Sequence, residues 1–306
     1  MSKTWLYVLI AIIALGLIVA VRLLFPFQVA PIKVAAEPLP GLVVPIPGFP
    51  IPVTNSLLTT WLTMAVLVLI ALWVRSGLQN VPTGKQNAAE MLVEGFYGLV
   101  EGIAGSKWAP TFFPIVMTIF LFVLLSNWID LLTPIFAAVG IQEHGEIIPV
   151  LRSPSTDLNF TVGLALISVA LTQFYGMRSH GWIGYWGRFI KVGWVSNLIA
   201  VFSGKRKGNP GGIIAMGLID TFMGLIELIS EIAKILSFSF RLFGNIFAGE
   251  VVLLVIPFLL SFLVPLIFMG LETFVGLIQA FIFAVLTLAF MAMAVASHGG
   301  AEHEAH

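Results

Sequence analysis

A single arginine inside a long apolar segment is the feature that most constrains this chain. Residues 211–256 form a predominantly apolar stretch of 46 residues, and Arg241 lies well inside it. A guanidinium keeps its charge in proteins, and burying it at membrane depth without a partner is costly. On a helix, the residues three and four positions away are its local neighbours. Those positions hold Ser237, Phe238, Gly244 and Asn245. None is a carboxylate, so we expect the anion to come from another segment or another chain.

The composition indicates a polytopic membrane protein. Hydrophobic residues make up 59% of the chain and charged residues 10%, against roughly a quarter charged in a soluble domain. The 15 basic and 15 acidic residues cancel, which does not favour a nucleic-acid partner. The chain has no cysteine, which excludes disulfides, thiolate metal sites and cysteine nucleophiles.

No nucleotide, cofactor or metal site is expected. The pairs Gly84-Lys85 and Gly204-Lys205 lack the upstream glycine and the following Ser or Thr of a phosphate-binding loop. The C-terminal histidines, His298, His303 and His306, are too loosely spaced to predict a metal site. The sequence therefore predicts no catalytic nucleotide chemistry in this chain.

The N-terminal region divides into an anchor and a connector. Residues 1–25 contain about twenty mostly apolar positions, Trp5 to Leu24, which can cross a hydrocarbon core of about 30 Å. The apolar part of a cleaved signal is usually shorter, about 7 to 15 residues, although the small residues at 34–36 leave cleavage as an alternative. Residues 26–53 are rich in proline and predict an extended segment at the surface.

We predict an all-α fold with about six membrane segments. After the anchor, the apolar segments are Leu57–Val74, Thr111–Ile135, Phe160–Tyr175, 211–256 and 266–298. Within the segment Thr111–Ile135, the polar residues Asn127 and Asp130 interrupt the apolar run near its C-terminal end. Residues 54–306 would form the main, ion-translocating domain.

An amphipathic helix is expected between the second and third segments. Thr83 to Gln86 resembles a capping box that opens a helix running to about Gly102. Glu90, Glu94 and Glu101 fall on one face of this helix, which is typical of a helix lying in the membrane interface. An ordinary cytoplasmic loop helix is the alternative.

The distribution of basic residues supports a cytoplasmic N-terminus. Alternating the spans from that start places ten Lys and Arg residues inside and only Arg22, Lys33 and Arg152 outside. Cytoplasmic loops carry an excess of Lys and Arg, so this agrees with the expected topology. The basic segment from Arg178 to Lys207 would be cytoplasmic.

The last two segments are too long to cross a membrane upright. As helices, residues 211–256 and 266–298 would be about 69 Å and 50 Å long, against a core of about 30 Å. Pro257 and Pro265 bracket the turn between them. The sequence therefore predicts a hairpin of two long, strongly tilted helices over residues 211–298.

Polar residues form a stripe along the first of these helices. At 100° per residue, five polar side chains fall within about 40° of the direction of Arg241. They are Glu227, Ser230, Lys234, Ser237 and Asn245. Lys234 has an alternative as a local partner of Glu231 or Glu227, and Asn245 as an interhelical hydrogen-bonding residue.

Further polar groups lie elsewhere on the hairpin. Glu250 points to the opposite side from Arg241, and Glu272 and Gln279 share one face of the final helix. Gln279 has the same interhelical alternative as Asn245. Carboxylates at membrane depth are rare and usually functional, so Glu250 and Glu272 are candidate proton carriers.

These residues resemble a known family. The segments RLFGNIFAGE at 241–250, ELISEIAKILSFSF at 227–240 and ETFVGLIQAFIFAVLTLAFMAMA at 272–294 are similar to subunit a of the rotary F-type ATP synthase. Shorter matches are PTGKQNAAEMLVE at 82–94, LSNWIDLLTP at 125–134 and SPSTDLNFTVGLALIS at 153–168. The likeness covers about Asn55 to the C-terminus.

The resemblance implies a role for each matching position. Arg241 matches the family's essential arginine, which faces the proton-carrying carboxylates of a rotating ring of c subunits. Positions matching the half-channel from the non-cytoplasmic side are Asn245, Glu250, Glu272 and Gln279, with Asn127 and Asp130 as contributors. Glu227, Ser230 and Ser237 match the path toward the cytoplasm. Some members carry histidine at one of two positions that are Gly249 and Glu272 in this chain. Because neither is histidine here, a histidine relay is not expected.

The resemblance also implies partners and a location. These are the c ring, b-type peripheral-stalk subunits and, through the complex, the soluble ATPase sector. The bacterial plasma membrane is the expected location, with the chloroplast thylakoid as the alternative. A stand-alone secondary transporter or ion channel with a buried Arg/Glu relay is the competing hypothesis. It would need its own countercharge for Arg241.

Overall fold

The computed structural model of the chain describes residues 35–45, 51–76, 79, 84–131, 140–143, 146–187, 189, 193–203, 209–259 and 263–296. The expected N-terminal anchor and the C-terminal histidines lie outside these residues. The described residues belong to two compact units. Unit 1 draws on 1–68, 122–157 and 243–280, and unit 2 draws on 69–121, 158–242 and 281–306.

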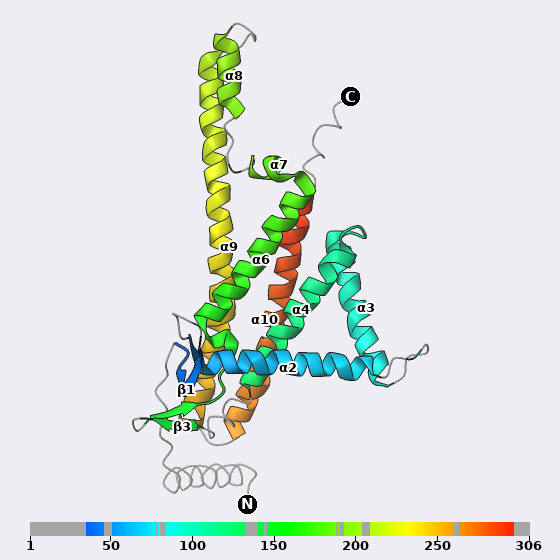
Figure 1. Cartoon of the computed structure of the whole chain (residues 1–306), viewed down its shortest axis with the longest axis vertical. Helices are drawn as coiled ribbons and strands as arrows, with labels where there is room; N and C mark the ends of the chain where they lie inside the picture. Colours follow the sequence, from blue (N-terminus) through cyan, green and yellow to red (C-terminus); the bar gives the residue numbers. More distant parts are fainter. Residues whose placement is uncertain are drawn as a thin grey trace, which may run out of the picture. The chain divides into compact units, whose positions relative to one another are not determined.

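Most of the described chain is helical (Figure 1). The helices are α2 (Asn55–Arg75), α3 (Lys85–Ala104), α4 (Ala109–Asp130), α6 (Leu158–His180), α7 (Trp182–Trp186), α8 (Gly193–Phe202), α9 (Pro210–Leu259) and α10 (Leu263–Val295). Five of them, α2, α4, α6, α9 and α10, are long and apolar enough to cross a membrane. The predicted all-α, multi-pass membrane class is confirmed, and the sixth predicted span lies outside the described residues.

Two small hairpins in unit 1 depart from an all-helical fold. Strands β1 (Pro38–Val44) and β2 (Ile51–Thr54) pair antiparallel, as do β3 (Gly140–Glu143) and β4 (Glu146–Pro149). Part of the predicted Pro-rich connector therefore forms paired strands. A short 3-10 turn, η1 (Pro154–Thr156), follows β4.

Asn55, the first residue of α2, joins the elements of unit 1. Its side-chain oxygen accepts a hydrogen bond from the Glu37 backbone N–H at 3.2 Å, and its nitrogen donates to the Pro149 carbonyl at 3.3 Å. Asn55 is fully buried, and so are Thr59 and Thr63 on the following turns of α2. A polar helix start thus anchors both hairpins.

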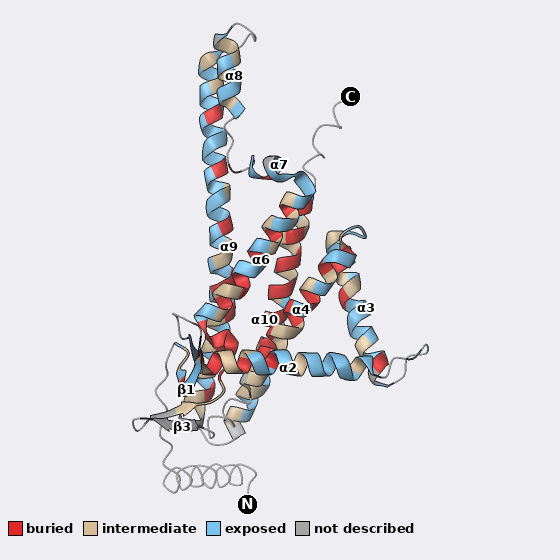
Figure 2. Cartoon of the chain, viewed as in Figure 1, coloured by how far each residue is buried: buried red, intermediate tan, exposed pale blue. Residues whose placement is uncertain are grey.

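Aromatic side chains form much of the core of unit 2. Phe96 of α3 lies 4.6 Å from Phe120 of α4 between ring centroids, and both rings contact Phe281 of α10 edge-on. Ser168 of α6 and Thr287 of α10 share a hydrogen bond of 2.7 Å in the interior. The buried residues of these helices are red in Figure 2.

The start of α3 differs from the sequence prediction. The cap is Gly84, and no side chain caps it. Gln86 instead accepts from the Gln79 backbone N–H at 2.8 Å and donates to its carbonyl at 2.9 Å. Helix α3 begins at Lys85, and Thr83, the first residue of the predicted capping box, lies outside the described residues. Glu90, Glu94 and Glu101 are exposed as expected, whereas the interfacial position of α3 stays a prediction.

Helices α9 and α10 are both continuous. They contain 50 and 33 residues, which corresponds to about 75 Å and 50 Å. Pro257 does not end the first helix, because α9 continues to Leu259, and Pro265 is the third residue of α10. Proline is tolerated in a first turn, since those N–H groups have no intrahelical partner. The strong tilt in a membrane stays a prediction.

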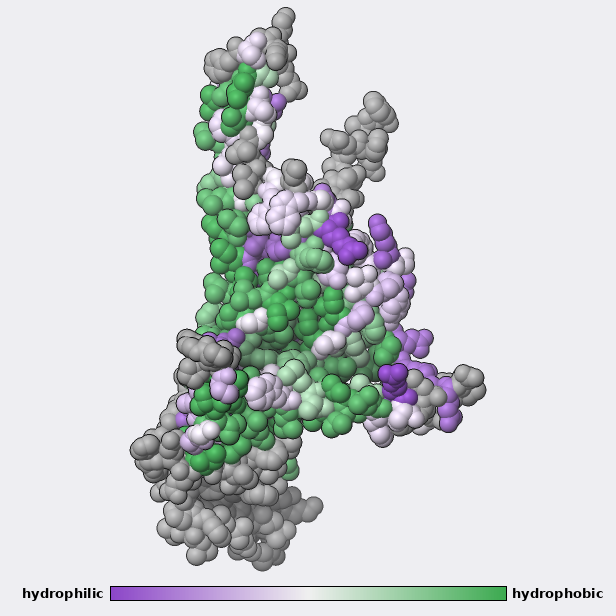
Figure 3. Space-filling model, viewed as in Figure 1, coloured by the Kyte–Doolittle hydropathy of each residue, from purple (hydrophilic) through white to green (hydrophobic). Residues whose placement is uncertain are grey.

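The unit 2 part of α9 exposes many large apolar side chains. Ile219, Phe222, Ile229 and Phe240 are each more than half exposed. This stretch is mostly pale blue in Figure 2, and apolar residues cover much of α9 on the face drawn in Figure 3. Such a surface requires lipid or another apolar partner.

Candidate functional site

Arg241 lies on α9 in unit 2, and its side chain is exposed. The guanidinium donates one hydrogen bond, from Nη2 to Ser237 Oγ at 3.4 Å, one helical turn away. Within the described part of the chain, Arg241 forms no ion pair with a carboxylate. The described residues thus provide no countercharge for this guanidinium.

Other polar residues of the stripe surround Arg241 along the same stretch of α9. Ser230 and Ser237 are exposed, and Glu227 is half-buried. Lys234 forms the local pair considered from the sequence, because its Nζ lies 2.7 Å from Glu231 Oε1. The same nitrogen also lies 4.8 Å from the centroid of the Phe290 ring.

Glu231 is a buried polar residue that the sequence analysis did not select as a site residue. Gln173 of α6 donates to Glu231 Oε2 at 2.9 Å, and the Tyr185 hydroxyl donates to Gln173 Oε1 at 2.6 Å. Glu231 is only 7% exposed. A glutamine within the apolar α6 segment was the available signal for this network.

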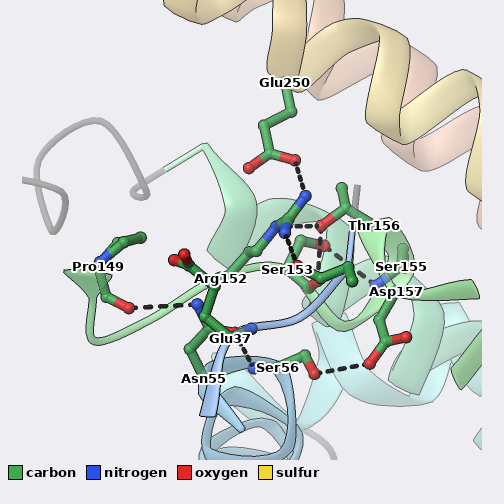
Figure 4. Close-up of polar contacts among 11 residues, drawn as sticks. Glu37, Asn55, Ser56, Pro149, Arg152, Ser153, Ser155, Thr156, Asp157 and Glu250 are labelled. Carbon is green, nitrogen blue, oxygen red and sulfur yellow. Dashed lines mark hydrogen bonds and ion pairs between the residues drawn. The ribbon is translucent and has the colours of Figure 1, made fainter. Parts of the chain in front are cut away.

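Unit 1 contains a buried arginine, Arg152 (Figure 4). Its Nη2 lies 3.2 Å from Glu250 Oε2 on α9, and the side chains are 6% and 13% exposed. The sequence analysis placed Arg152 in an outer polar loop and gave it no function. Its partner lies 98 residues away, so no local pattern could have revealed the pair.

The turn that carries Arg152 is held by its own hydrogen bonds. Ser153 Oγ accepts from the Ser155 N–H at 3.2 Å, and Thr156 Oγ1 donates to the Ser153 carbonyl at 2.9 Å. The Arg152 backbone N–H donates to Thr59 Oγ1 at 3.1 Å. At the end of the turn, Asp157 accepts from Ser56 Oγ at 2.8 Å.

Asn127 connects this turn to α10. Its Oδ1 accepts from Ser155 Oγ at 2.7 Å, and its Nδ2 donates to the Gly276 carbonyl at 3.1 Å. Trp128 makes a similar bond, from Nε1 to the Thr273 carbonyl at 3.2 Å. Asp130 is the last residue of α4, but its side chain lies outside the described part of the structure.

Glu272 of α10 is half-buried and lies against Gly249 of α9, next to Glu250 in the chain. Its Oε1 is buried and has no hydrogen-bond partner among the described residues. Gln279 is half-buried and Asn245 is exposed, and neither makes a side-chain hydrogen bond within the described chain. Two of the predicted outer-path residues, Asn127 and Glu250, contact the same turn. Asn127 bonds to Ser155, and Glu250 bonds to Arg152.

The described residues contain no group of three or more His, Asp or Glu placed to hold a metal ion. The chemistry available in unit 1 is that of carboxylates, amides, hydroxyls and one buried guanidinium. The carboxylates can bind and release protons, whereas the amides, hydroxyls and guanidinium can orient them through hydrogen bonds.

The model of the family described as ATP synthase A chain matches residues 57–292. The chain belongs to this family. It is 31% identical over 259 residues to a protein named ATP synthase subunit a from Desulforamulus reducens, covering 81% of this chain and 82% of that protein. A second ATP synthase subunit a, from a Nitratiruptor species, is 33% identical over 238 residues, covering 78% and 88%.

Membership in the ATP synthase A chain family, together with five apolar helices, makes this an integral, multi-pass protein of the ATP synthase membrane sector. The matched range includes the helices that carry Arg241, Glu250 and Glu272. It also includes the Arg152 turn. The hydrogen-bonded groups around Glu231 and around Arg152 therefore both lie within the residues that match the family.

Proposed function

We propose that this chain is the stator subunit of the ATP synthase membrane sector. It offers two offset proton half-channels to a rotating ring of c subunits, and Arg241 faces the ring carboxylates. The observation that supports this proposal is the environment of Arg241. A permanent cation lies exposed on an apolar helix and has no carboxylate partner in the described chain.

The mechanism follows from the fixed charge of Arg241. A ring carboxylate takes up a proton from one half-channel and gives it up to the other after nearly a full turn. When the carboxylate reaches Arg241, the guanidinium stabilises its ionised form and favours release of the proton. The same charge repels a proton that would cross directly between the two paths.

The proposed paths use different parts of the chain. The outer, non-cytoplasmic path contains Asn127, Asp130, Asn245, Glu250, Glu272 and Gln279. Its support is the buried, unpartnered Glu272 oxygen, as judged among the described residues, and the burial of Asn127. The path toward the cytoplasm contains Glu227, Ser230 and Ser237. The proposed partners are the c ring, the peripheral stalk and the soluble ATPase sector, in a bacterial plasma membrane.

A stand-alone transporter or channel is a weaker alternative. Such a protein would have to neutralise Arg241 with one of its own acids. The ion pairs seen among the described residues include Arg152–Glu250 and Lys234–Glu231, and neither involves Arg241.

The test is to replace Arg241 by lysine and by alanine in the assembled complex. Arg241→Lys is expected to impair coupled ATP synthesis and proton pumping, because lysine lacks the planar fork of the guanidinium. Arg241→Ala is expected to abolish both, because it removes the charge. Arg75→Gln is the matched control, since Arg75 is an exposed arginine at the end of α2. Full coupled synthesis by Arg241→Lys would contradict the proposal.

A further inference from the structure

The Arg152 guanidinium is bound on three sides by three different groups. Nε donates to Thr156 Oγ1 at 3.2 Å, Nη1 to the Ala35 carbonyl at 3.0 Å and Nη2 to Glu250 Oε2 at 3.2 Å. Figure 4 shows the guanidinium between its own turn and the carboxylate that descends from α9. This arginine is therefore held in one orientation.

The hydrogen bonds of the turn do not depend on this guanidinium. Ser153, Ser155 and Thr156 bond within the turn, and Asp157 is held by Ser56. The bond from Nη2 is the one that fixes a carboxylate of another element.

Glu250 is held by only one of its two oxygens. Oε2 accepts the bond from Arg152, and within the described residues no hydrogen bond to Oε1 is formed. The Glu250 side chain is only 13% exposed, so solvent has little access to the carboxylate. The contact with Arg152 thus sets the direction of the second oxygen.

We propose that Arg152 is a positioning residue for Glu250 in the outer proton path. Arg152 anchors Oε2, so that Oε1 faces the path. A proton binds to Oε1 and later leaves from it. Arg152 itself stays charged and exchanges no proton. This inference depends on the proposed function, which places Glu250 in that path.

The geometry requires arginine at this position. Three bonds leave the planar fork in fixed directions, whereas a lysine ammonium is a single point charge on a flexible stem. Lysine would keep the positive charge near Glu250 but would not hold the carboxylate in one orientation. We therefore expect Arg152→Lys to retain only part of the function.

The experiment measures proton conduction through the membrane sector of the assembled complex, in vesicles from which the soluble ATPase has been removed. The variants are Arg152→Gln, Arg152→Lys, Glu250→Gln and the double variant Arg152→Gln/Glu250→Gln. We expect Arg152→Gln to lower conduction on the order of 10-fold to 100-fold, because misplacement of a reacting group carries losses of this size. Arg152→Lys should restore part of that loss, and Arg75→Gln should conduct like the parent.

The double variant separates positioning from an independent role. If Arg152 acts through Glu250, the double variant conducts within about 2-fold of Glu250→Gln alone. If the two losses multiply, or if Arg152→Gln conducts normally while Glu250→Gln does not, the inference is wrong. Normal conduction by Glu250→Gln would instead refute the placement of Glu250 in the path, and with it the basis of the inference.

A second variant covers the case in which Arg152→Gln does not assemble. Thr156→Val removes both the acceptor of Arg152 Nε and the donor to the Ser153 carbonyl, but it keeps both charges of the pair. It should lower conduction less than Arg152→Gln, and only when Glu250 is present. An equal loss in the Glu250→Gln background would show that Thr156 acts independently and would overturn the positioning role.

Discussion

Gly249 of α9 lies so close to the Glu272 carboxylate of α10 that a Cβ at position 249 would overlap all three carboxylate atoms. The two helices approach within unit 1 because position 249 has no side chain. Glu272 fills the space that a larger residue would occupy. The size of residue 249 and the position of this carboxylate are therefore coupled.

Gly249→Ala is expected to impair proton translocation by displacing Glu272. The carboxylate is the end of a flexible side chain, so it can move, but it would leave its present position. Adding Glu272→Asp should recover part of the activity, because the shorter side chain leaves room for the methyl group. ATP-driven pumping by the two variants checks this. Gly270→Ala is the control, since a Cβ there meets nothing within 4 Å.

Asn127→Leu is expected to destabilise the protein. The change leaves the buried Ser155 hydroxyl and the Gly276 carbonyl without the hydrogen bonds that Asn127 now makes. An unsatisfied buried polar group costs about 1–3 kcal/mol. The thermal midpoint of the detergent-solubilised complex should fall. Asn245→Leu, at an exposed position, should not lower it, and an equal loss there would contradict the structural argument.

Glu231→Ala is expected to destabilise unit 2 by removing the partner of two groups. Gln173 and Lys234 would both lose the carboxylate that they bind. A lost charge-assisted hydrogen bond in a buried setting costs about 1–3 kcal/mol. The double variant Glu231→Ala/Lys234→Met should lose less than the sum of the single changes. Additive losses in chemical unfolding would show that the pair is not coupled.

Gly176→Ala is expected to disturb the packing of α7 on α6. A Cβ at position 176 would overlap the Tyr185 ring, and this ring is only 2% exposed, so it has little space to move. Overpacking of this kind costs about 1–3 kcal/mol. Gly163→Ala in the same helix meets nothing within 4 Å. It should be neutral or slightly stabilising, because alanine is the better helix former, and circular-dichroism melts would compare the two.

Long apolar runs made the membrane helices predictable. The segment Leu57–Val74 became α2, and 211–256 became most of α9, because a continuous apolar run in a membrane has to be helical to satisfy its backbone. The bounds differ by only a few residues at each end, as expected for helix termini. The absence of an acid three or four residues from Arg241 also followed from spacing alone.

Features that depend on distant contacts were not predictable. The strands β1 to β4 are short, and they pair through backbone bonds that leave little trace in composition. The short helices α7 and α8 lie in a region that was interpreted mainly by its positive charge. Arg152 looks like an ordinary loop arginine until α9 brings Glu250 beside it. For Arg152 the deciding partner lies 98 residues away.

Near Gly276, helix α4 binds α10 through the main chain of α10. Asn127 and Trp128 of α4 bind the carbonyls of Gly276 and Thr273, which every residue type possesses. Substitutions at position 273 can therefore accumulate without releasing α4, while position 276 is limited by bulk, since a Cβ there would lie 3.1 Å from Asn127. A graft of residues 273–276 from a relative should keep both bonds to α4 as long as it carries a small residue at position 276.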